Sequence, residues 1–223
     1  LKFTDGGLER DKVLIRLASL LHDIGHAPFS HVGEEVMPIN SNTSKPYKHE
    51  NYSAAAIIHL MQDVIEDHPV NQNHKIKCRE IADFLNNSSA IGRSLLWRGL
   101  ISSQLDADRA DYLLRDSHHI GVAYGRYDLQ RLLATITVAI DPETSSPILA
   151  VEKGGFHAAE GLIIARYMMF TQVYFQHTRR AYDHHISAVM KALLAHSKRR
   201  AVGQDKFPPP IDNKLFFGNC CIV

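Results

Sequence analysis

The sequence lacks the features that mark several classes of protein. It has only three cysteines in 223 residues, Cys78 and the adjacent Cys220 and Cys221, which do not make a disulfide framework. A reducing, cytoplasmic compartment is therefore expected. No run of about 18 apolar residues is present, so we predict no transmembrane helix and no membrane partner.

An excess of charge of one sign is also missing. Lys and Arg number 25 against 24 Asp and Glu, a formal net charge of +1, which favours neither a nucleic-acid coat nor a membrane-surface protein. The first residues, "LKFTDGGLERD", contain neither an initiator Met nor the apolar core of a signal peptide. We expect the chain to be a fragment of a globular protein, and its 45% hydrophobic content suits one sizeable core.

Helical periodicity dominates the pattern of apolar residues. Asp11 is expected to cap a helix that runs to about Ala27, where Pro28 ends it, because the residue before a proline avoids the helical conformation. Further helices are expected after Ser30 and at 50–67, 76–86, 90–101, 104–117, 155–177 and 179–198. Residues 135–152 read as a β-hairpin, so the predicted fold is mostly α with one small hairpin.

Histidine is abundant, with 14 in the chain, and several stand close together. The stretch "LASLLHDIGHAPFSH" follows an apolar helical run with His22, Asp23, His26 and His31. His22 and His26 are four residues apart and share a helix face. Imidazole with a neighbouring carboxylate suits a divalent transition metal, so this stretch is a candidate for half of a metal site.

Two acidic motifs follow downstream. "KHEN" pairs His49 with Glu50, and "QLDADRADYLLRD" places Asp108 and Tyr112 on one stripe of a helix. Taken singly, a buried histidine is most often a core residue with satisfied hydrogen bonds, and the acids could be a solvated helix face. The combination of motifs favours a metal site over separate structural roles.

These motifs carry a resemblance. "LLHDIGHAPFSH", "HE" and "LDADRADYLLRD" resemble the HD-domain phosphohydrolases, and within them the deoxynucleoside triphosphate triphosphohydrolases. The resemblance runs from about Leu14 to His184. It implies an HD-domain helical bundle over residues 1–200, an irregular segment at 201–223, and hydrolysis of a deoxynucleoside triphosphate (dNTP) to deoxynucleoside and triphosphate.

The resemblance also implies roles for the candidate residues. His22, Asp23 and Asp108 match ligands of a divalent metal ion, which could be Fe, Mn, Ni, Zn or Mg. His26 matches the histidine beside the reacting phosphate. Glu50 matches the acidic partner of that histidine, and His49 precedes it as in the family. The metal would activate a water for attack at the α-phosphorus.

A substrate pocket with a phosphate side and a sugar side is implied as well. The residues that match the phosphate side are His31, Arg109 and Arg180. On the sugar side, Tyr112 matches a residue that lines the pocket, Asp116 one that binds the 3′-hydroxyl, and Tyr182 one that crowds the 2′ position. Relatives of this type form homo-oligomers with nucleotide effectors, and Tyr124 and Arg126 are among the candidate contact positions.

One ligand of the family is missing, because no histidine precedes His22. We expect truncation of the preceding helix to explain this; a degenerate site is the alternative. Two other functions stay open: another HD-domain phosphohydrolase, acting on a nucleoside monophosphate or other phosphoester, and a non-catalytic nucleotide-binding regulatory module. Asp116 and Tyr182 favour the dNTP reading.

Overall fold

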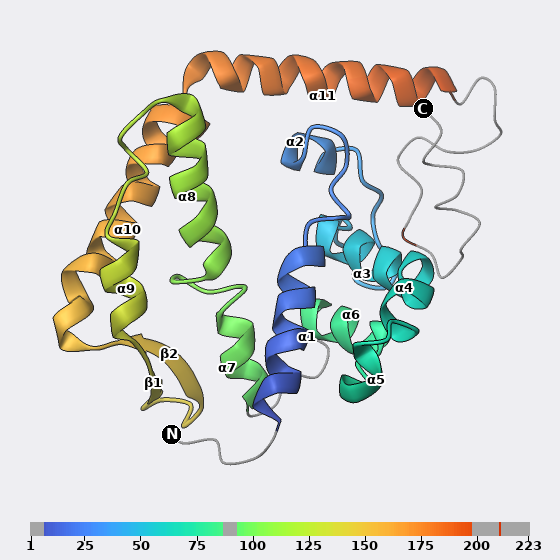
Figure 1. Ribbon diagram of the computed structural model, residues 1–223. Coiled ribbons are helices and arrows are strands. Elements are labelled where there is room, and N and C mark those ends of the chain that lie inside the picture. The colour runs from blue at the N-terminus through green and yellow to red at the C-terminus, as the bar shows by residue number, and fades with distance from the viewer. Residues whose placement is uncertain (1–6, 87–92, 198–209, 211–223) are drawn as a thin grey trace. The chain divides into compact units, whose positions relative to one another are not determined.

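The structure, a computed structural model, divides into two compact units (Figure 1). The residues that it describes are 7–86, 93–197 and 210. The "N-terminal unit" comprises residues 5–89 and 181–223, and the "hairpin unit" comprises residues 1–4 and 90–180. The described residues are mostly helical with one two-stranded antiparallel sheet, which confirms the predicted fold class.

The N-terminal unit is built from helices. They are α1 (Leu8–Leu21), α2 (His31–Glu34), α3 (His49–Leu60), α4 (Gln62–Glu66), α5 (Asn71–His74), α6 (Cys78–Asn86) and the part of α11 (His177–Ser197) that follows Arg180. Helices α1 and α3 both pack against α6. Their contact buries Ala18, Ile57 and Ile81 completely, so an apolar core supports the segment between α1 and α3.

Helix α1 differs from its prediction at both ends. It begins at Leu8 with Gly7 at the N-cap, so Asp11 lies inside the helix instead of capping it. It ends at Leu21, six residues before Ala27, and a turn follows. The predicted helix at 50–67 is interrupted at Met61, whose backbone leaves the helical region at φ −103° and ψ 0°.

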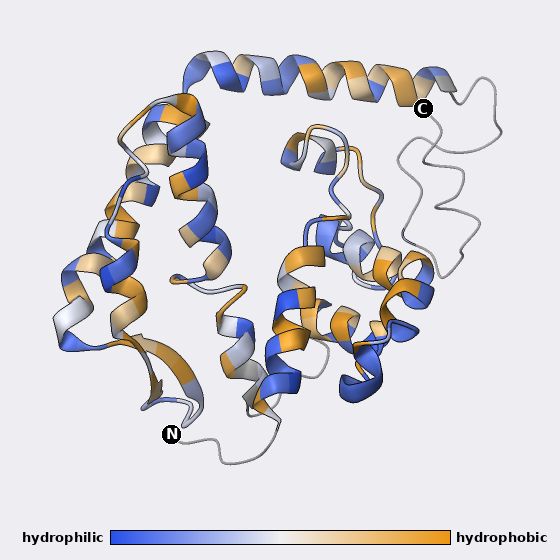
Figure 2. Cartoon of the chain, viewed as in Figure 1, coloured by the Kyte–Doolittle hydropathy of each residue, from blue (hydrophilic) through white to orange (hydrophobic). Residues whose placement is uncertain are grey.

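The hairpin unit surrounds a second apolar core. Its elements are α7 (Arg93–Gly99), α8 (Ala107–Ile120), α9 (Leu129–Thr135), β1 (Ile136–Ile140), β2 (Pro147–Val151), α10 (Phe156–Met169) and a π-helical turn (Phe170–Tyr174). The strands pair antiparallel with Ile136 opposite Val151, as the hairpin prediction requires, and both are strongly apolar (Figure 2). Leu113, Leu132 and Leu162 form the centre of the core.

Two predictions concern the C-terminal part and the membrane. The predicted domain boundary near residue 200 and the irregular segment 201–223 lie outside the described residues, apart from Pro210. Within the described ranges, every helix is too short or too polar to cross a membrane.

Cys78 offers a simple test of the packing in the N-terminal unit. It begins α6 and is 2% exposed, and burial, with Glu66 nearby, raises the pKa of its thiol to about 11. Because only the thiolate reacts, we expect Cys78 to resist iodoacetamide in the folded protein at mildly alkaline pH and to react fully in denaturant. Mass spectrometry of the peptide that contains Cys78 measures this. Equal labelling in both conditions would contradict the packing.

Candidate active site

The turn after α1 is held by a serine on α3. Ser53 is completely buried; its Oγ donates to the His22 carbonyl oxygen at 2.5 Å and accepts from the Gly25 N–H at 2.9 Å. In a continued helix, the His22 carbonyl oxygen and the Gly25 N–H would bond to main-chain groups of α1. Ser53 takes both bonds instead, so α1 ends at Leu21. Gly25 is essential here, because an added Cβ would overlap the backbone of Ser53.

Ser53→Ala tests this arrangement. Removal of the hydroxyl leaves the His22 carbonyl and the Gly25 N–H without their partner, and we expect the free energy of unfolding to fall by about 1–3 kcal/mol. Urea denaturation measures it. The matched control is Ser146→Ala, since that exposed hydroxyl makes only a 3.4 Å bond. Equal stability of the two variants would show that Ser53 does not hold the turn.

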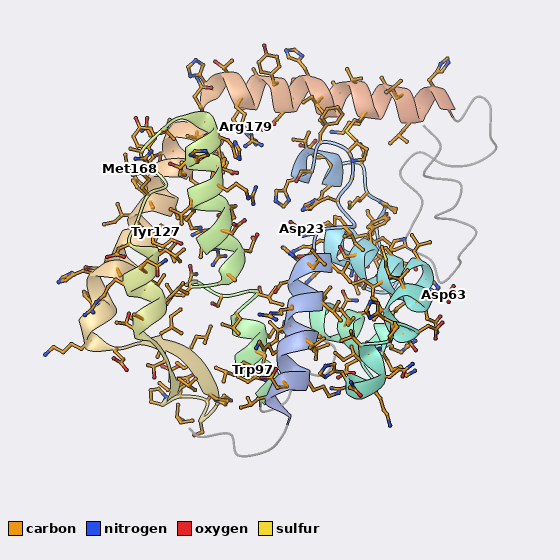
Figure 3. The ribbon with its side chains drawn as sticks, viewed as in Figure 1. Asp23, Asp63, Trp97, Tyr127, Met168 and Arg179 are labelled. Carbon is orange, nitrogen blue, oxygen red and sulfur yellow. The ribbon has the colours of Figure 1, made fainter. Side chains whose placement is uncertain are left out.

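His22 and Asp23 lie on this turn with geometry that suits a metal ion. His22 Nδ1 is 2.8 Å from the Ser19 carbonyl oxygen, which can only accept, so Nδ1 carries the proton and Nε2 keeps its lone pair. Nε2 is 3.2 Å from Asp23 Oδ1, and the Asp23 side chain is half-exposed beyond the end of α1 (Figure 3). A histidine fixed through Nδ1 is typical of metal ligands, so both residues fit that role.

Three imidazoles surround one carboxylate beside this turn. Glu34 Oε1 lies 2.5 Å from His49 Nδ1, 3.1 Å from His31 Nδ1 and 3.8 Å from His26 Nδ1. We call these four residues the histidine cluster. Their ligand atoms all lie within 4.8 Å of one another, so the cluster could itself hold a metal ion. The sequence predicts the metal at other residues, His22, Asp23 and Asp108.

Two of the imidazoles also reach Asp23. The rings of His26 and His49 stack at 3.9 Å, and their Nε2 atoms lie 3.5 and 3.6 Å from Asp23 Oδ1. The stacked pair therefore lies between two carboxylates, one at each edge. Burial, together with the charge of His49, lowers the pKa of His26, which favours a neutral ring that can exchange a proton.

Glu34 remains ionised in this setting. Burial acts to raise its pKa, but hydrogen bonds from His49 and His31 outweigh burial and lower the pKa below its ordinary value. Glu34 is therefore an acceptor for the surrounding N–H groups. Sequence reasoning missed it; the available signal was its position three residues after His31 in the short helix α2.

Glu50 does not pair with His26 as predicted. Glu50 Oε2 lies 3.6 Å from His49 Nδ1, and neither that oxygen nor His26 Nδ1 has a hydrogen-bond partner among the residues that the structure describes. The reason is helical geometry. Adjacent residues on α3 point about 100° apart, so His49 faces His26 and Glu50 turns away.

In the hairpin unit, the start of α8 positions the second motif. Asp106, at the N-cap, accepts from the Arg109 N–H at 2.7 Å and from the Ser103 N–H at 3.1 Å. This cap fixes Asp108 and Arg109 in the first turn. The Arg109 guanidinium donates to the Ser103 carbonyl oxygen, so in this structure its side chain is bound by the chain itself.

Tyr112 and Asp116 follow along the same face of α8. Burial raises the pKa of Tyr112, and the neighbouring Arg166 guanidinium offsets this only in part, so the phenol stays protonated. Asp116 Oδ2 accepts from the Tyr174 hydroxyl at 2.7 Å. Sequence reasoning missed Tyr174, which belongs to the π-helical turn, because no local pattern links it to a residue 58 positions earlier.

Comparison with protein families decides which fold family these motifs represent. The HD domain matches residues 2–116, which include both motifs, and the HD associated region matches residues 127–209. The chain is a member of the HD-domain family. Its histidine–aspartate turn and the start of α8 both lie within the HD domain.

Relatives of this HD-domain protein are longer than the chain. It is 36% identical over 188 residues to the uncharacterized protein MJ1154 of Methanocaldococcus jannaschii, covering 83% of this chain and 35% of that protein. With the uncharacterized protein YwfO of Bacillus subtilis the identity is 33%, over 78% of this chain and 35% of that protein. With the deoxynucleoside triphosphate triphosphohydrolase SAMHD1 of Xenopus laevis the identity is 31%, over 56% of this chain and 24% of that protein. The chain thus spans about a third or less of these relatives' length.

The remaining candidate residues of the HD-domain protein are distributed over both units. Asp108 belongs to the hairpin unit and His22 and Asp23 to the N-terminal unit, so their union in one metal site stays a prediction. Arg180 and Tyr182 lie on α11; the Arg180 guanidinium is 5.7 Å from the Phe175 ring centre and Tyr182 is exposed. Their substrate contacts also stay predictions.

Proposed function

We propose that this HD-domain protein is a metal-dependent hydrolase that converts a dNTP to deoxynucleoside and triphosphate. The observation that carries the proposal is the position of the histidine cluster directly beside the His22–Asp23 turn. A metal-ligand pair next to three imidazoles around an ionised carboxylate suits phosphoester hydrolysis. The dNTP substrate is supported by the SAMHD1 relatives, whose name states that activity, and by Asp116 and Tyr182.

His22 and Asp23 are the residues that would hold the divalent ion, with Asp108 as the proposed third ligand. A bound ion of this kind lowers the pKa of water and neutralises phosphate charge. Two serines would support the metal site indirectly. The Ser19 carbonyl oxygen fixes the His22 ring, and the Ser53 hydroxyl fixes the turn. Fe, Mn, Ni, Zn and Mg are the candidates for the ion.

The histidine cluster supplies proton transfer and positive charge. His26 and His49 each face Glu34 through Nδ1 and Asp23 through Nε2, so either ring can take a proton at Nε2 while Glu34 stabilises the charged form. The His31 side chain is 74% exposed and its Nδ1 is fixed by Glu34, so its Nε2 would donate to a phosphate oxygen when the ring is protonated on both nitrogens. Glu50 is proposed to act through His49.

The remaining roles follow the resemblance. Arg109 and Arg180 would bind the triphosphate, where Arg offers a planar fork of donors, and Tyr112, Asp116 and Tyr182 would bind the sugar. A homo-oligomer with a nucleotide effector is also proposed. Exposed apolar side chains that such an interface would bury lie on α10: Phe156, Ile163, Ile164 and Tyr167.

Product analysis tests the proposal. The full-length protein, freed of metal and reloaded with each candidate ion, is incubated with dNTPs, ribonucleotides and nucleoside monophosphates, and products are separated by anion exchange. We expect deoxynucleoside and intact triphosphate from dNTPs only, lost on chelation and in Asp23→Asn. Cleavage of monophosphates alone would favour another phosphohydrolase. Nucleotide binding without any product would favour the regulatory module.

A further inference from the structure

Tyr174 is brought to α8 by an irregularity in the backbone. Helix α10 passes into the π-helical turn, in which the Phe175 N–H donates to the Phe170 carbonyl oxygen at 2.8 Å, five residues back. The wider turn changes the direction of the side chains that follow it. Such turns are often found at functional sites, which directs attention to the side chain that this one presents.

The position of Tyr174 is fixed from several sides. Its ring lies edge-on to Phe170 at 5.2 Å and to Tyr112 at 6.1 Å, and Arg179 Nη1 donates to its carbonyl oxygen at 2.8 Å. Burial, and then the bond to Asp116, raise the pKa of Tyr174, so the hydroxyl keeps its proton and donates. Neighbouring rings and a main-chain bond therefore hold one hydroxyl in a defined direction.

The acceptor of this hydroxyl is Asp116. Tyr174 Oη lies 2.7 Å from Asp116 Oδ2. Arg115 Nη1 lies 3.6 Å from Asp116 Oδ1, but Nε and Nη2 of the same guanidinium contact Asp111 at 2.9 Å. A carboxylate that accepts one bond through Oδ2 still offers lone pairs on Oδ1. Because a carboxylate oxygen accepts hydrogen bonds, the group that it recognises must carry a donor, such as a sugar hydroxyl.

We propose that Tyr174 is a positioning residue for substrate selection: it fixes Asp116 so that the other carboxylate oxygen, Oδ1, accepts a sugar hydroxyl, and it thereby sets the preference for nucleotides that carry a 3′-hydroxyl. This inference rests on the proposed function, and within it on Asp116 as the sugar-binding acid. It assigns a role to a residue outside the histidine–aspartate and α8 motifs.

Substrate discrimination tests the inference. The full-length enzyme is assayed with a dNTP and with the corresponding 2′,3′-dideoxynucleotide, and the ratio of the two kcat/KM values is compared between wild type and Tyr174→Phe. Loss or misdirection of a hydrogen bond to a charged group lowers such a ratio about tenfold. We therefore expect the dNTP-to-dideoxynucleotide ratio to fall about tenfold in Tyr174→Phe, mainly through a higher KM for the dNTP. In an Asp116→Ala background, Tyr174→Phe should change the ratio no further.

Tyr127→Phe is the matched control, because the Tyr127 hydroxyl also donates to α8, but to the main-chain carbonyl oxygen of Ala110, 2.8 Å away, instead of to a carboxylate. We expect it to lower stability without changing the ratio. An unchanged ratio in Tyr174→Phe, or an equal fall in Tyr127→Phe, would overturn the inference while wild-type hydrolysis upholds the proposed function. If the wild type hydrolyses neither nucleotide, the proposed function fails and the inference fails with it.

Discussion

Glu34→Gln is expected to lower kcat for nucleotide hydrolysis about 100-fold or more while the protein stays folded. Glu34 Oε1 is the atom on which the Nδ1 atoms of His26, His31 and His49 converge. Glutamine keeps the shape of the side chain but not its charge, so the imidazoles lose the group that stabilises their protonated forms. Steady-state rates, with circular dichroism to verify folding, measure the effect.

The matched control is Glu160→Gln. Glu160 also contacts a histidine, with Oε2 2.8 Å from His157 Nδ1, but the His157 side chain is 93% exposed and both residues lie on α10. Solvent screens such a pair, so its loss should leave the rate unchanged. Wild-type turnover in Glu34→Gln would show that the carboxylate plays no part in the chemistry.

Gly25→Ala is expected to lower the free energy of unfolding by about 3 kcal/mol and to abolish activity. The added Cβ would lie 2.5 Å from the His49 carbonyl oxygen and would overlap the backbone of Ser53. These are main-chain atoms in the first turns of α3, so the overlap cannot be relieved by rotation of a side chain. The turn that carries His22 and Asp23 would have to move away from α3.

Gly161→Ala is the control for this substitution. A Cβ at Gly161, in the middle of α10, would meet only Tyr127 Cβ at an ordinary 3.7 Å. Alanine is the better helix former, so a gain of roughly 0.5–1 kcal/mol is expected there. Denaturation curves and activity measure both variants. Equal stability of Gly25→Ala and wild type would contradict the close approach of the turn and α3.

The local sequence pattern predicted the β-hairpin correctly but placed the end of α1 too late. The hairpin at 135–152 was recognised because β-branched residues flank a polar turn, and β1 and β2 lie within it. Nothing local to residues 22–27 stops a helix before Pro28. The helix ends at Leu21 because Ser53, far along the chain, takes the hydrogen bonds of the turn.

The same limit applies to the candidate site. His26, His31 and His49 were recognised from motifs, and the structure brings them together. Their common partner is Glu34, whereas Glu50, the expected partner of His26 alone, lies near His49, because the faces of α2 and α3 that meet are set by packing. Residues joined only by tertiary contact leave no spacing pattern in a single sequence.

Measuring where the metal ion binds is the most direct test of the proposed active site. We propose that the ion lies at His22 and Asp23, with Asp108 as third ligand, whereas the histidine cluster is a second group of residues that could hold it. Inductively coupled plasma mass spectrometry on the purified full-length protein, reloaded with divalent ions, compares wild type with Asp23→Asn and Glu34→Gln. We predict bound metal in wild type and Glu34→Gln and none in Asp23→Asn. Retention in Asp23→Asn with loss in Glu34→Gln would contradict the account.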